Sequence, residues 1–191
     1  MSSPLVLALL ALALGEADAA PPPTSTALRR AAEAGQRAWV RVRGTGTAAG
    51  VLAGADGQVL TLGDLVHGSA ALVELGEAQR TAHVASRLPS LGLVLLAIDG
   101  DGPFPAPPAR LEPPKQGEWV VGLGDRGANP MLGKVTHAGT GPWFEVSLRL
   151  PPGSPLLDAQ GKLLGVVTVR LGASSRVAAM SSVRTELERP R

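Results

Sequence analysis

The sequence contains no cysteine, and this absence excludes several kinds of site. The chain has no disulfide staples, no thiolate ligands for a metal ion and no cysteine that could carry a lipid anchor. The histidines do not form a metal site either, because His67, His83 and His137 are far apart and show none of the usual spacings of metal ligands. We therefore expect neither a metal nor another cofactor.

Aromatic residues are scarce, with three tryptophans and two phenylalanines. The 18 basic residues barely outnumber the 16 acidic ones, and they form no long run. Single-stranded nucleic acid is bound by aromatic platforms along a basic groove, so we expect no nucleic-acid partner. Asp56, Asp99 and Asp101 lack the ligand spacing of a calcium loop, and we interpret them as turn formers.

No apolar run is long enough to span a membrane, which takes about 20 residues. The longest run, Leu5–Leu14, is followed by the small residues Ala17-Asp18-Ala19-Ala20, as at a signal-peptidase site. We predict that residues 1–20 are a signal peptide and that the mature protein is exported to the periplasm or secreted, without a membrane span. A retained apolar helix is the alternative.

Short runs of β-branched and apolar residues, separated by glycine-rich turns, fill most of the remaining chain. This rhythm predicts an all-β protein of two packed antiparallel barrels. Proline-rich sequence after Ile98 predicts a linker between the halves, since proline cannot donate to a sheet. The predicted divisions are an N-terminal linker with a short helix capped by Thr26 (21–38), a first barrel (39–98), a linker (99–116), and a second barrel with a closing helix capped by Ser181 or Ser182 (117–191).

Four stretches, in order, resemble the trypsin-like serine proteases with the chymotrypsin fold, HtrA/Deg-like members in particular. The first and second resemble the segments that carry the family's histidine and aspartate, and the third resembles a hairpin of its second barrel. The fourth resembles the nucleophile loop and the closing strand and helix. We expect no PDZ-like module to follow. The stretches are "GTGTAAGVLAGADGQVLTLGDLVHGS", "AHVASRLPSLGLVLLAI", "GEWVVGLGDRGANPMLGKVTHAG", and "PPGSPLLDAQGKLLGVV" with "RVAAMSSVRTEL".

The resemblance implies that all three catalytic residues are missing. The family's histidine base falls on Asp64, its aspartate on Gly92 and its serine nucleophile on Pro152. The oxyanion hole uses the backbone N–H of the nucleophile and of a glycine two residues earlier. Pro152 has no N–H, and Leu150 stands at the glycine position. The resemblance thus implies a catalytically inactive homologue.

Two kinds of function remain open from the sequence. The first is a binding or scaffolding module that docks a protein or extended peptide without cutting it; a purely structural subunit belongs to the same group. The second is a serine hydrolase with a rearranged site, built from Ser154, His67 and Asp64. Ser154 stands two residues beyond the nucleophile position and His67 three beyond the base position, so we favour the first.

Overall fold

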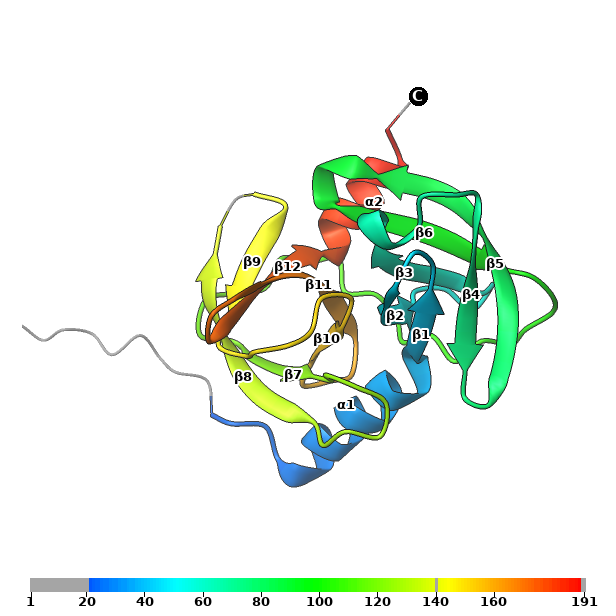
Figure 1. The fold of residues 1–191 in the computed structure, drawn as a ribbon. Helices are drawn as coiled ribbons and strands as arrows, with labels where there is room; N and C mark the ends of the chain where they lie inside the picture. Colours follow the sequence, from blue (N-terminus) through cyan, green and yellow to red (C-terminus); the bar gives the residue numbers. More distant parts are fainter. Residues whose placement is uncertain (1–20, 140, 190–191) are drawn as a thin grey trace, which may run out of the picture.

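The structure, a computed structural model, describes residues 21–139 and 141–189. The segment predicted to be a signal peptide, residues 1–20, lies outside the described residues. In the described part, strands close into two antiparallel barrels of six strands each, which lie side by side in Figure 1. The predicted two-barrel, all-β fold with short terminal helices is confirmed.

The first barrel has the strand order β1-β2-β3-β6-β5-β4, and β4 pairs back onto β1. Gly57, with a φ of 83°, makes the tight turn between β2 and β3. A short 3₁₀ turn follows β3 and another precedes β6. The elements are β1 (Trp39–Arg43), β2 (Thr47–Leu52), β3 (Gln58–Leu62), η1 (Gly63–Leu65), β4 (Ala70–Leu75), β5 (Ala78–Leu88), η2 (Pro89–Leu91) and β6 (Leu93–Ile98).

The second barrel has the order β10-β11-β12-β9-β8-β7 and closes through the pairing of β7 with β10. β10 is buried along its whole length, and the inner half of β11 is buried as well. The elements are β7 (Trp119–Gly122), β8 (Met131–Ala138), β9 (Trp143–Val146), β10 (Pro155–Asp158), β11 (Leu163–Leu171) and β12 (Ser174–Ala179).

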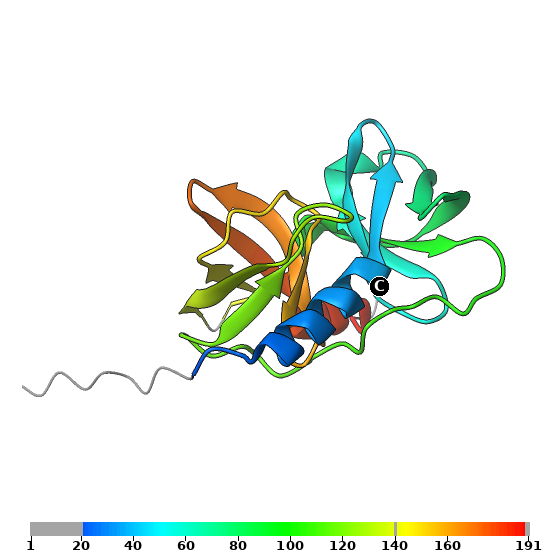
Figure 2. The same ribbon diagram turned by 90° about the horizontal axis from the view of Figure 1, so that it is seen from below.

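Helix α1 (Ser25–Ala38) packs against β7 and β10 and leads directly into β1 of the other barrel, as Figure 2 shows from below. Its N-cap is Thr24, whose hydroxyl accepts from the Ala27 N–H at 3.2 Å, so the predicted cap at Thr26 is wrong. Thr24 directly follows the proline run and has the extended backbone that a cap requires. Thr26 lies inside the first turn.

Helix α2 (Met180–Leu187) begins where β12 ends, with Ala179 as its N-cap and no side-chain cap. The predicted caps at Ser181 and Ser182 are therefore wrong. Buried Met180 and Val183, one turn apart, join the core of the first barrel, so packing determines where this helix starts. Neither α1 nor α2 has the length and apolar character of a membrane-spanning helix.

The proline-rich linker is fastened to the second barrel by a partly buried charge cluster. Arg110 makes two hydrogen bonds to the Glu118 carboxylate and lies 3.5 Å from an Asp158 oxygen. Its backbone N–H donates to Leu163 O at 2.9 Å. Burial of the Glu118 carboxylate acts to raise its pKa, but the Arg110 hydrogen bond, the Lys115 N–H and the neighbouring positive charges outweigh this, so the pKa lies below its ordinary value.

We expect Glu118→Gln to lower the free energy of unfolding by about 1–2 kcal/mol near neutral pH. Because the folded-state pKa of Glu118 is lowered, the stabilisation is fully present above the unfolded value of 4.5 and is lost as pH falls through the lower folded value. The free energies of unfolding of the wild type and of Glu118→Gln, measured with urea, should therefore become equal in acid. Glu188→Gln, which removes an exposed partner of Arg184, should change stability by less than about 0.5 kcal/mol. A difference for Glu118→Gln that persists undiminished in acid would contradict this account.

Candidate functional site

The loop at the predicted histidine position is held by hydrogen bonds to a neighbouring loop, while the side chain of Asp64 faces solvent. Asp64 lies in η1 and is exposed. The backbone N–H of Thr45 donates to Leu65 O at 2.9 Å, which fixes η1 against the loop between β1 and β2. A Cβ added to Gly44 would lie 2.0 Å from the same carbonyl oxygen, so the two loops are in close contact. The position that the resemblance assigns to the histidine base therefore carries an exposed carboxylate.

Gly92, at the predicted aspartate position, lies next to the turn that carries Asp64. The N–H of Gly63 donates to Gly92 O at 2.9 Å, which brings the residue before Asp64 against Gly92. Gly92 ends η2 with a φ of 67°, and a Cβ built there would meet nothing within 4 Å. The structure thus places two of the three positions that the resemblance assigns to the triad on neighbouring turns, and neither carries a histidine or a buried acid.

The loop at the nucleophile position meets the same side of the first barrel. Gly153 has a φ of 90°, and its N–H donates to Val167 O at 2.7 Å. A Cβ at Gly153 would lie 2.1 Å from Ala49 O on β2. The same Ala49 oxygen accepts from the buried Thr61 hydroxyl on β3 at 2.9 Å. The loop with Pro152 therefore packs on the strand pair that leads into Asp64.

The backbone N–H of Leu150, at the predicted oxyanion position, already donates to a side chain of the same barrel. The N–H of Leu150 donates to Ser175 Oγ at 3.0 Å, and that hydroxyl donates to Leu148 O at 2.7 Å. Both bonds are buried. The Leu150 side chain is fully buried in the second-barrel core, where it lies on Gly122 of β7. The Leu150 N–H therefore points into the interior of its own barrel.

Ser175 was not singled out from the sequence. It stands among the small residues of β12, and only its contact with a loop 25 positions earlier gives it a role. A hydroxyl at a buried strand position is the one signal that the sequence offers, and it does not identify the partner.

The alternative set of Ser154, His67 and Asp64 is not brought together as a hydrogen-bonded group. Ser154 is completely buried, and its Oγ has no hydrogen-bond partner. His67 is exposed on the loop after η1, where Arg87 holds the backbone through the carbonyl oxygens of Val66, His67 and Gly68. A nucleophile must reach its base within about 3 Å and must meet solvent or substrate. The geometry gives Ser154 neither.

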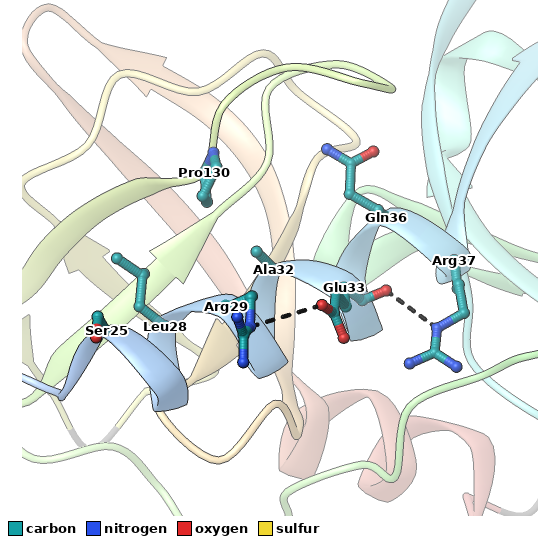
Figure 3. A pocket seen from close by; sticks show the side chains of 8 residues that line it. All are labelled: Ser25, Leu28, Arg29, Ala32, Glu33, Gln36, Arg37 and Pro130. Atoms are coloured by element: carbon teal, nitrogen blue, oxygen red, sulfur yellow. Dashed lines mark hydrogen bonds and ion pairs between the residues drawn. The ribbon is translucent and has the colours of Figure 1, made fainter.

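Two pockets lie outside these loops or at their edge. A cavity of about 350 Å³ beside the histidine-position loop is lined by Thr45, Leu65 and His67, among others. Another, of about 690 Å³, runs along the outer face of α1, and Figure 3 shows Leu28, Ala32 and Pro130 around it. The second pocket includes none of the residues predicted from the sequence. Among the described residues, no group of three potential ligands is placed to hold a metal ion.

Sequence comparison with protein-family models and with curated proteins gives no match. Solved structures do match. The Rv3671c protease in an inactive form shares 24% identity with a TM-score of 0.67, over 87% of this chain and 96% of that one. Rv3671c from M. tuberculosis H37Rv, as an inactive serine-to-alanine mutant, shares 23% identity with a TM-score of 0.69, over 90% of this chain and 98% of the other. With its two closed barrels, this chain has the chymotrypsin-like fold of these proteases.

Proposed function

We propose that this chain is a catalytically inactive homologue of the trypsin-like, HtrA-like serine proteases, and that it binds an extended segment of a protein partner. The observation that carries the proposal is the state of the two backbone groups that would form an oxyanion hole. Pro152 has no N–H, and the Leu150 N–H is bonded to the Ser175 hydroxyl inside the barrel. Loss of even one such donor costs about 10²–10³ in rate.

The side chains support the same proposal. Asp64 and Gly92 provide no base and no acid to orient one, and proline cannot act as a nucleophile. The buried Ser154 hydroxyl has no partner that would activate it. Export to the periplasm or beyond is part of the proposal and rests on the sequence of residues 1–20.

The outer part of β11 is the surface best suited to an extended peptide. β10 pairs with β11 up to Val166. The loop just before β10 extends this pairing by one residue, because Gly153 and Ser154 exchange backbone hydrogen bonds with Val167. Beyond that point, the described residues give β11 only β12 as a neighbour, over Val169–Leu171. Val169 is 43% exposed although it is a large apolar residue on a strand. A strand with one unpaired side and an exposed apolar side chain can accept a peptide by β-augmentation.

The test is retention of extended peptides on the immobilised protein, with mass spectrometry of what is recovered. We expect captured peptides to be recovered intact, and Val169→Asp to weaken retention about tenfold or more, because it places a charge beside the pairing edge. Met131→Asp is the control, since Met131 is 38% exposed but lies on β8. Recovery of cleaved peptides, lost on Ser154→Ala, would instead favour the rearranged hydrolase. Retention equal in Val169→Asp and the wild type would reject β11 as the docking strand.

A further inference from the structure

A second feature, separate from the triad positions, is a pocket of about 430 Å³ where four parts of the chain meet. Its walls come from the end of α1 and the start of β1, from the β4–β5 hairpin, from the linker and from the loop after β7. A volume of this size suits a small organic molecule. Asp64, Gly92 and Pro152 do not line it.

Three arginines from different segments line this pocket: Arg37, Arg80 and Arg126. Across residues 21–139 and 141–189, none of the three forms an ion pair with a carboxylate. The Arg37 Nε and one Arg80 Nη donate to backbone carbonyls, at 3.3 and 3.4 Å. Asp101 also lines the pocket, and the C-terminal end of α1 adds about half a negative charge. Three guanidinium groups outweigh both, so the pocket is net positive.

The loop that carries Arg126 is fixed in place by α1. The Gly127 N–H donates to Gln36 Oε1 at 2.8 Å, and Gln36 Nε2 donates to Ala128 O at 2.8 Å. Figure 3 shows Gln36 extending away from α1. The Arg126 guanidinium lies over the β4–β5 turn, where a Cβ on Gly76 would stand 3.0 Å from its Nη2. The backbone next to Arg126 is therefore held by α1 before any ligand binds, which lowers the entropy cost of binding.

The base of the pocket is aromatic. Phe104 and Trp39 line it and are only 8% and 5% exposed. Both residues therefore contribute the edges of buried rings to the pocket wall. The pocket thus combines unpaired cations with apolar rings.

From this combination we propose that the pocket binds a small organic anion, with a phosphate or carboxylate group held by the arginines and an apolar body against Phe104 and Trp39. Arginine forks match both oxyanions. The site goes beyond the proposed peptide-binding function and does not depend on it, since β11 contributes no residue to the pocket.

Calorimetric titration of the full chain with phenyl phosphate tests the proposal. We expect saturable binding with a dissociation constant of about 1 mM or tighter, and weaker binding of inorganic phosphate. Arg80→Gln and Arg126→Gln should each weaken binding about tenfold. Arg30→Gln removes the same charge from an exposed position on α1 that does not line the pocket, and it should leave binding unchanged.

The outcomes that would overturn the proposal are distinct. No saturation by about 10 mM phenyl phosphate means that there is no site. An equal loss in Arg30→Gln and Arg126→Gln means that only the overall charge attracts the anion. Equal affinity for inorganic and phenyl phosphate means that the aromatic base takes no part. Circular dichroism of each variant confirms that it is folded before titration.

Discussion

Gly153→Ala is expected to lower the free energy of unfolding by about 4 kcal/mol or more, a large share of the total for an ordinary domain. Its φ of 90° is strained for any residue with a Cβ. The added Cβ would also lie 2.1 Å from the Ala49 oxygen and 2.8 Å from its carbonyl carbon. These are backbone atoms of β2, held by the Thr61 hydroxyl, so they cannot turn aside as a side chain would. Urea unfolding followed by circular dichroism measures the loss.

Gly117→Ala provides the matched control. Gly117 has a φ of 81° and its N–H donates to Val135 O at 2.8 Å, as the Gly153 N–H does to another carbonyl. A Cβ there meets nothing within 4 Å, so only the backbone strain of about 1–2 kcal/mol should appear. The difference between the two variants measures the contact of the nucleophile-position loop with the first barrel. Equal losses of unfolding free energy in the two variants would mean that the loop can move away from β2 at little cost in free energy.

The fold could be predicted from the sequence because its signals are local. The run Leu93–Ile98 is apolar throughout and bounded by Gly92 and Gly100, which is typical of a buried strand, and the structure has β6 there. The helix caps were harder. Three hydroxyl residues follow one another at the start of α1, and only backbone conformation selects Thr24. At α2 no side chain caps at all, because burial of Met180 starts the helix.

The candidate site could be predicted only in part, since its key contacts join residues far apart in the sequence. Asp64, Gly92 and Pro152 followed from the resemblance, and the structure places the first two on adjacent turns. The hydrogen bond from Leu150 to Ser175 depends on how a loop lies against β12, which no local pattern encodes. The arginine pocket could not be predicted for the same reason, because its cations come from a helix, a hairpin and a loop that are far apart in the sequence.

Introducing the three triad residues alone is expected to give a folded but only weakly active protein. Asp64→His changes an exposed side chain. Gly92→Asp adds a side chain where a Cβ meets nothing within 4 Å, so it should cost only the backbone strain of about 1–2 kcal/mol that a φ of 67° imposes. Pro152→Ser supplies a nucleophile and one N–H. The wild type has proline at this position, so its labelling by a fluorophosphonate probe should be undetectable. In the triple variant the second donor stays bonded to Ser175, so labelling should stay about 10²–10³-fold below that of an active protease of this fold.

Leu150 has two roles, since its backbone N–H is the predicted second donor and its side chain fills the core of the second barrel. Adding Leu150→Gly to the triple variant affects both. From the sequence alone, glycine there would be expected to release the second donor and raise activity. The structure changes that expectation, because the Leu150 side chain is fully buried on Gly122 and its removal should cost about 3–5 kcal/mol. Adding Ser175→Ala instead leaves the core filled, but the freed N–H still points into the barrel, so labelling should not rise. Strong labelling of the triple variant without either addition would show that the loop rearranges and that the Leu150–Ser175 bond does not keep this site silent.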